Sequence, residues 1–217
     1  MSESVLEGVL QPLIGRAAWK IDGGGLMRNE LEFEFGDARV EREESRDFTR
    51  VRTYGEYGLE LLGGAWRVTP KPEHAELLPE IRSDMDDTLR RRRIRRTSTL
   101  GDLLSVRVER LEANFRIHLD FQRAEVEVDS HTVATWRQEF DENYDEDEWD
   151  DADDEDMPEH MTVLQLRTLA GYFEVYHDGT YTPPDRLLDL EDPGSMPPDE
   201  RRRLWPDFDA LQNPLGR

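Results

Sequence analysis

The stretch Leu31-Glu32-Phe33-Glu34-Phe35 alternates apolar and acidic side chains, and this period of two decides the fold class. Successive side chains of a β-strand point to opposite faces of the sheet, so the alternation predicts a strand with one buried face. Gly36-Asp37 follows as a turn signal, and Ala38–Glu41 then alternates again. This part of the chain therefore predicts an antiparallel hairpin.

Short strands are predicted on both sides of this hairpin. Asp22-Gly23-Gly24-Gly25 marks a turn before it, and Phe48–Tyr54 and Gly58–Leu62 resume the strand pattern after it. Gly63-Gly64 has the composition of a two-residue hairpin loop that leads into a strand over Ala65–Val68. The first third of the chain is thus predicted to be a run of short antiparallel strands.

Helical patterns border these strands. Ser4–Leu10 begins with the spacing of a capping box, in which a serine and a glutamate bind free amide groups, and Pro12 ends it. Glu73 to about Arg93 carries an apolar side chain every four residues, which predicts a helix that Pro79 breaks or kinks. A short helix is also predicted over Pro198–Trp205 in the proline-rich tail.

The strand pattern returns 86 residues later, from Gly101, which corresponds to Gly15. At this offset the apolar positions of Arg116–Phe121 and Ala124–Asp129 coincide with those of the first hairpin, so a second hairpin is predicted. The shared turns favour an internal duplication over the alternative, a chance alignment of two amphipathic hairpins.

The end of the second half resembles Gly58–Val68 at a larger offset of about 113 to 115 residues. It comprises strands over Tyr172–Tyr176 and Thr180–Thr182 around a turn at Asp178-Gly179. An insertion into the second copy would explain the larger offset. Met161–Leu169 fits a strand or a helix by its own pattern, and the repeat favours a strand.

These patterns predict a β-rich α+β protein with two similar antiparallel sheet units, which a duplication would explain, joined by a helical linker. The expected organisation is a first β-rich unit with an N-terminal helix at 1–69, an arginine-rich helical linker at 70–99, a second β-rich unit with an acidic insertion at 100–182, and a proline-rich tail at 183–217.

The charge is unevenly distributed along the 217 residues. Fifty acidic and 28 basic side chains give a formal net charge of −22, and 14 of the acids lie in Glu139–Glu159, the acidic tract, which contains no base. Without these 14 acids the remaining 196 residues would carry −8, so the tract holds most of the imbalance. Of the 28 bases, 26 are arginines, a bias typical of a bacterial genome rich in GC.

The acidic tract is the main candidate for a partner-binding surface. Closely spaced carboxylates match the charge density of a nucleic-acid backbone and would attract a basic protein. Aromatic residues within the tract would serve as anchors. The predicted partner-binding residues are Asp141, Glu142, Tyr144, Asp145, Asp147, Trp149, Asp150 and Asp151.

Two other interpretations of the tract remain open. Blocks of like charge resist folding, so the tract would be a solvated loop without a partner. Many carboxylates would also suit calcium, but the tract lacks the glycine that an EF-hand loop requires at its sharp turn.

A basic patch is predicted from six arginines in seven positions: Arg90, Arg91, Arg92, Arg93, Arg95 and Arg96. Nucleic-acid binding is disfavoured, because no aromatic residue lies among these arginines and the net charge opposes it. Pairing with the acidic tract or with a partner is favoured, and a solvated helix end is the remaining alternative.

No catalytic residue, metal ligand or cofactor is predicted. The chain has no cysteine, which excludes disulfides and thiol chemistry. The five histidines include no pair at a metal-ligand spacing, and His118 should face solvent. Gly23-Gly24-Gly25 lacks the Lys-Ser/Thr of a phosphate loop. Asp129-Ser130-His131 has the residue types of a hydrolase triad, but adjacency does not make a triad, and a turn is predicted.

The cellular location follows from two absences. No apolar run approaches the roughly 20 residues of a membrane-spanning helix. Met1–Glu7 has no basic region and carries two acids, unlike a secretory signal. We therefore expect a cytoplasmic protein that does not act at a membrane.

Several short motifs resemble small β-rich bacterial domains of unknown function, some of which look like immunity proteins encoded beside toxins. They are Leu13-Ile14-Gly15, Trp19, Leu31–Gly36 and Gly64-Ala65-Trp66-Arg67. The resemblance covers residues 13–68 and extends to a second copy over 100–182. It implies an inhibitory role but assigns no functional residues.

The sequence therefore predicts a non-catalytic interaction protein, an immunity-type inhibitor that neutralises a basic partner such as a toxin or nuclease. A hydrolase or metal-dependent enzyme with a site between the two units is the first alternative. A structural adaptor in a bacterial defence system or another assembly is the second.

Overall fold

The structure is a computed structural model that describes residues 3–23, 30–44, 49–94, 97, 99–112, 114–130, 162–168, 171–176 and 181–182. Its helical elements are α1 (Glu3–Leu10), η1 (Gln11–Leu13), η2 (Pro72–His74) and α2 (Asp87–Ile94). Its strands are β1 (Ala17–Gly23), β2 (Glu30–Glu44), β3 (Thr49–Pro70), β4 (Ile81–Arg82), β5 (Gly101–Arg110), β6 (Phe115–Phe121), β7 (Ala124–Ser130), β8 (Thr162–Thr168), β9 (Gly171–Tyr176) and β10 (Tyr181–Thr182).

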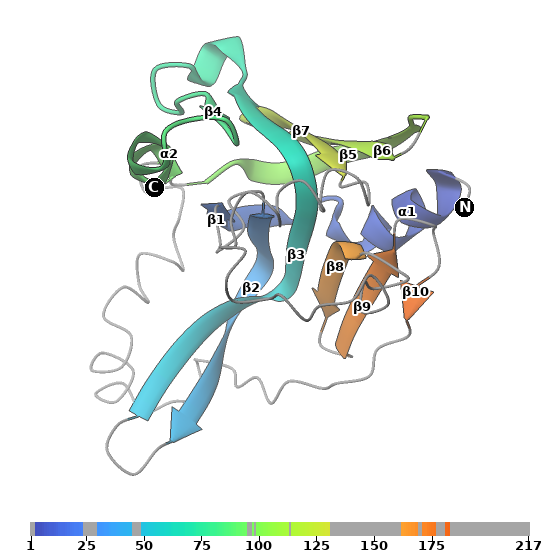
Figure 1. Cartoon of the computed structure of the whole chain (residues 1–217). Coiled ribbons are helices and arrows are strands. Elements are labelled where there is room, and N and C mark those ends of the chain that lie inside the picture. The colour runs from blue at the N-terminus through green and yellow to red at the C-terminus, as the bar shows by residue number, and fades with distance from the viewer. Residues whose placement is uncertain are drawn as a thin grey trace, which may run out of the picture.

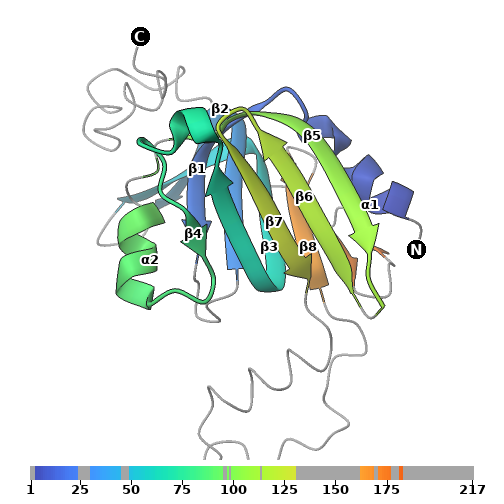
Figure 2. The same ribbon diagram turned by 90° about the horizontal axis from the view of Figure 1, so that it is seen from above.

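The strands form one antiparallel sheet that closes on itself (Figures 1 and 2). The hydrogen-bonded order is β10-β9-β8-β3-β2-β1-β5-β6-β7, and β7 also pairs with β3. The closed part is therefore a six-stranded barrel, β1-β2-β3-β7-β6-β5. The fold is β-rich as predicted, but the two predicted units share one sheet because β3 pairs with strands from both halves of the chain.

The barrel interior is packed with the apolar side chains that the alternation predicted to be buried. Phe33 and Phe35 of β2 meet Phe121 of β6, with ring centroids 5.6 to 6.0 Å apart. Leu6 and Leu10 of α1 are buried in the same core, and α1 packs on β5. Burial of these apolar side chains is the main favourable contribution to the fold.

Two glycine motifs that were predicted to be turns are bulges within long strands. Gly36, with φ of +75°, lies inside β2, whose register with β3 shifts between Phe35 and Ala38. Gly63-Gly64 lies inside β3, whose register with β7 shifts between Gly63 and Ala65. Both hairpin predictions are wrong, because a partner strand is available on either side of each glycine motif and a bulge bends the strand without ending it.

The bulge in β3 changes which side chains face the core. Leu59 and Leu61 are buried before it, and Trp66 and Val68 are buried after it, so the inward positions change from odd to even numbers. One extra residue produces this change, because strand side chains alternate with a period of two. The same strand can therefore pair with β2 and β8 along one stretch and with β7 along the next.

The predicted helical linker is mostly irregular. Residues 75–80 follow η2 without a regular helix, β4 pairs with β3, and α2 begins only at Asp87. Pro79 lies in the irregular part, where its missing N–H and its ring disfavour a continuous helix. The prediction of a helix over Glu73–Arg93 is thus correct only for its last turns.

The other local predictions have different outcomes. Helix α1, the hairpin of β6 and β7, and strand β8 are confirmed. The expected match of Gly58–Val68 to Tyr172–Thr182 fails, because the first segment is one strand and the second contains the two paired strands β9 and β10. Asp129 and Ser130 belong to β7 and do not form a turn. The predicted helix at Pro198–Trp205 lies outside the described residues.

Strands β7 and β8 occupy consecutive stretches of one edge of β3. Ser130 of β7 pairs with Gly63, and Leu164 of β8 pairs with Leu61. Figure 1 shows both strands on the side of β3 opposite β2. The segment 131–161, which includes the acidic tract, thus leaves and rejoins the sheet at neighbouring positions. No helix in the described part of the chain is long and apolar enough to cross a membrane.

Candidate functional site

A row of acidic side chains crosses the outer face of the sheet. Adjacent strands place Asp22 beside Glu32, Glu32 beside Glu60, and Glu60 beside Gln165. Gln165 in turn lies beside Glu174 and donates a 2.8 Å hydrogen bond to its carboxylate. Directly opposed side chains in a sheet are close neighbours, so strand register alone brings these acids together.

We call Glu30, Glu32, Glu60 and Glu174 the acidic cluster. Carboxylate oxygens of the first three lie within 4.8 Å of one another. None of these three glutamates forms an ion pair with another described residue. The cluster therefore concentrates negative charge that the described barrel does not neutralise.

Burial and mutual repulsion raise the pKa values in this cluster. The pKa of Glu60 rises to about 7, first because of burial and then because of repulsion by Glu32, Glu30 and Glu174. The pKa of Glu30 is also raised, by burial and then by Glu32. A cation bound here would favour the ionised carboxylates and relieve the repulsion between them.

A buried ion pair between Arg167 and Glu34 lies beside the cluster, two residues further along the same strands. Arg167 of β8 extends across Gly58 of β3 to Glu34 of β2, and both charged residues are less than 10% exposed. Arg167 also donates to the carbonyl of Gly55 at 2.9 Å, and Glu34 accepts from the amide of Gly55 at 2.6 Å. Burial raises the pKa of Glu34 despite the attraction of Arg167. This pair joins β8 to the barrel.

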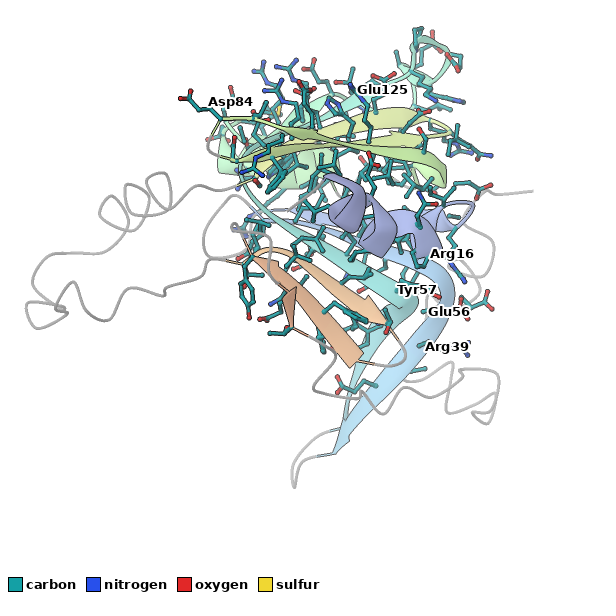
Figure 3. All side chains as sticks on the ribbon, turned by 90° about the vertical axis from the view of Figure 1, so that its right-hand side faces the viewer. Arg16, Arg39, Glu56, Tyr57, Asp84 and Glu125 are labelled. Carbon is teal, nitrogen blue, oxygen red and sulfur yellow. The ribbon has the colours of Figure 1, made fainter. Side chains whose placement is uncertain are left out.

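A second charged group lies where β1, β2 and β3 bend. Glu56 accepts hydrogen bonds from Arg16 at 2.7 Å and Arg39 at 3.0 Å, and the Arg16 guanidinium lies 4.4 Å from the ring centroid of Tyr57. Figure 3 shows these four side chains together on one side of the molecule. Glu56 thus has two cationic partners, so this group does not leave an unpaired carboxylate.

His118 lies on the outer face of β6, as its alternation with buried neighbours predicted, but it is only partly exposed. Its imidazole nitrogens lie 3.5 Å from Glu127 and 3.8 Å from Glu109. This face is separate from the acidic cluster, and no described histidine lies beside the cluster. His131, His160 and His177 are outside the described residues.

The predicted basic patch does not form a uniform surface. Arg90 is 1% exposed and donates to the carbonyl of Ser83 at 2.9 Å, while Arg93 donates to the carbonyl of Glu80. Arg91 and Arg92 are exposed, and Arg91 lines a hollow that Glu30 and Glu32 also line. Arg95 and Arg96, like all the predicted partner-binding residues of the acidic tract, lie outside the described residues.

Sequence reasoning missed the acidic cluster. The alternation with phenylalanines predicted that Glu32 and Glu34 lie on the outer face; both do, but Glu34 is buried there by its ion pair with Arg167. Nothing in the sequence aligned them with Glu60 and Glu174, because strand register sets that relationship. Comparisons with protein-family models, curated proteins and solved structures find no match for this chain.

Proposed function

We propose that this protein is a non-catalytic interaction protein, an immunity-type inhibitor in the bacterial cytoplasm that neutralises a basic toxin or nuclease. The observation that carries the proposal is the acidic cluster, whose Glu30, Glu32 and Glu60 have no described cationic partner. A basic partner would supply the missing positive charge, and complementary charge accelerates association.

The positions of the strands that flank the acidic tract in the chain support the same proposal. The tract lies within 131–161, whose flanking strands pair with β3 at Gly63 and Leu61. Glu60 is the neighbouring residue on β3. Because the two strands that flank the tract in the chain end near Glu60, we infer that the tract and the cluster contribute to one acidic surface.

Association kinetics test this proposal. The probe is a fluorescent dodeca-arginine peptide, and its dodeca-citrulline counterpart is the neutral control. Association should slow steeply between about 0.05 and 0.5 M NaCl, because salt shortens the range of electrostatic attraction. Replacing Asp145, Asp147, Asp150 and Asp151 with Asn should slow association, and Trp149→Ala should speed dissociation if that ring is an anchor.

The matched control removes charge from another face. Glu112 and Glu125 are exposed on the β5–β6–β7 side and form no ion pair with a described residue. The Glu112→Gln/Glu125→Gln variant should bind nearly as well as the wild-type protein. Association that is independent of salt and of the tract substitutions would contradict the proposal.

The metal-dependent alternative has one specific observation in its favour. Three carboxylates within 4.8 Å of one another offer the oxygen ligands that calcium and magnesium prefer. Calorimetric titration with Ca²⁺, Mg²⁺ and Mn²⁺ separates the two functions. Saturable binding below about 0.1 mM that Glu60→Gln abolishes would favour a metal site. The absence of a heat of binding for all three ions would count against a metal site and favour a basic partner.

We also propose that the two three-stranded halves of the barrel arose by duplication. Gly15 and Gly101, which are 86 residues apart, both have left-handed φ values, 83° and 79°, just before β1 and at the start of β5. Phe35 and Phe121 have the same separation, and their rings stack with centroids 6.0 Å apart. In homologous sequences the internal similarity should recur at this offset.

A further inference from the structure

A small pocket opens on the outer face of the sheet beside the acidic cluster. It has a volume of about 130 Å³ and is lined by residues of β2, β3, β8 and β9. This is well below the roughly 300–1,000 Å³ of a typical small-molecule site. The described α-helices pack elsewhere, α1 on β5 and α2 on β1 and β4. Because its volume is about 130 Å³, the pocket suits a single inserted side chain.

The glycine at position 58 shapes this pocket. A Cβ atom at Gly58 would lie 2.6 Å from Nη2 of Arg167, so glycine is required for the arginine to cross. Arg167 and Glu34 neutralise each other in the lining. Among the described lining residues, the remaining charges are those of Glu32 and Glu60, so this part of the lining is acidic overall.

The aromatic residues of the lining are suited to a planar cation. Tyr54 and Tyr172 line the pocket, and the Arg167 guanidinium already lies 4.7 Å from the ring centroid of Tyr54. The same combination of guanidinium, tyrosine ring and carboxylate recurs in the pairing of Arg16 with Tyr57 and Glu56. An arginine over a tyrosine ring gains electrostatic attraction as well as contact area.

We infer that this pocket receives one arginine side chain of the basic partner. The inference rests on the proposed function and specifies how the partner is recognised. The planar guanidinium carries five N–H donors and can bridge Glu32 and Glu60, whose oxygens lie within 4.8 Å of each other. A lysine ammonium is a more compact charge that cannot bind in the same forked geometry.

Peptide binding by variants of the full chain tests the inference. The probes are dodeca-arginine and dodeca-lysine, which carry the same charge. The wild-type protein should bind the arginine peptide about tenfold more tightly, and Glu32→Gln/Glu60→Gln should remove most of that preference. Glu112→Gln/Glu125→Gln, which removes the same charge elsewhere, should retain it. Thermal unfolding of each variant verifies that it is folded.

A second measurement separates local insertion from general attraction. Titration with dodeca-arginine should shift the NMR signals of the Tyr172 ring, and Tyr172→Leu should weaken binding of this peptide several-fold more than binding of dodeca-lysine. Binding that depends on salt but does not distinguish the peptides, or a Glu32/Glu60 variant that behaves like its control, would overturn the inference and leave the proposed function standing. Absence of salt-dependent binding to either peptide would refute both.

Discussion

At the scale of single residues, the glycine at position 58 determines how β8 joins the barrel. Gly58 leaves space for Arg167 to reach Glu34, and the amide and carbonyl of Gly55 satisfy the rest of the pair. A buried charge is costly without such partners. The pair therefore makes attachment of β8 specific and depends on all four residues.

The first prediction concerns this pair. Arg167→Met should lower the free energy of unfolding by about 3–5 kcal/mol at pH 8, because it leaves Glu34 buried and unpaired. Removing the cation raises the pKa of Glu34 further, so its protonation in the folded state should make the loss smaller at pH 5. Urea unfolding at both pH values measures this. The exposed Arg107→Met should change stability by less than about 0.5 kcal/mol, and an equal loss in the two variants would contradict the argument.

The second prediction concerns Glu60. Its pKa is raised to about 7 in the folded protein, so the folded state binds its proton more tightly than the unfolded state. The wild-type protein should therefore lose stability as the pH rises from about 4.5 to 7. Glu60→Gln removes this dependence and should be more stable than the wild-type protein by about 1–2 kcal/mol at pH 8. This value is reduced because solvent screens a partly exposed charge.

Urea unfolding between pH 4 and 8 follows this difference for Glu60→Gln and for the exposed Glu125→Gln. The Glu60 variant should differ little from the wild-type protein at pH 4. A constant difference across the range, or the same profile in both variants, would show that Glu60 is not repelled by its neighbours.

At the scale of elements, the bulge in β3 allows one strand to belong to two parts of the sheet. Before the bulge β3 pairs with β2 and β8, and after it β3 pairs with β7 and β4. The inward side chains change from Leu59 and Leu61 to Trp66 and Val68. The additional residue therefore keeps apolar side chains in the core on both sides of the bend.

The third prediction follows from that change. Deleting Gly64 would remove the bulge and turn Trp66 and Val68 outward, so the variant should lose its cooperative thermal unfolding transition. Deletion of Ala75, an exposed residue between η2 and β4, is the control and should preserve the transition. A Gly64 deletion that unfolds like the wild-type protein would show that β3 can change its register without cost to the core.

At the scale of the whole molecule, the acidic tract lies in the chain between two strands, β7 and β8, that share one edge of β3. The pairings of Ser130 and Leu164 are only two β3 residues apart, which is about 7 Å along a strand. The sheet is continuous through β3, which pairs with both β7 and β8. The barrel should therefore not depend on the tract for its integrity.

The fourth prediction tests this independence. Deleting Asp141–Asp156 should leave the thermal unfolding temperature unchanged or slightly higher, because repulsion among the acids is relieved. Any gain should be greatest at low ionic strength. Calorimetry at two salt concentrations measures both effects, and a large decrease in unfolding temperature would show that the tract is part of the folded body.

The sequence by itself determined that Leu31–Phe35 and the segments of β6 and β7 form strands and that their apolar side chains are buried. The alternation of Leu31, Phe33 and Phe35 with glutamates sufficed, because side-chain direction in a strand follows from local backbone geometry. The hairpin of β6 and β7 was predictable for the same reason, since its strands and its turn are adjacent in sequence.

Only the tertiary structure decided whether each glycine motif ends a strand or bends it, and which acids become neighbours. Gly63-Gly64 has the composition of a loop. However, β7 and β8 pair with the edge of β3 opposite β2, and this pairing favours a continuous strand. Glu32, Glu60 and Glu174 come from three strands, and their juxtaposition depends on long-range register. Pairing partners distant in the chain set that register, and no local pattern encodes them.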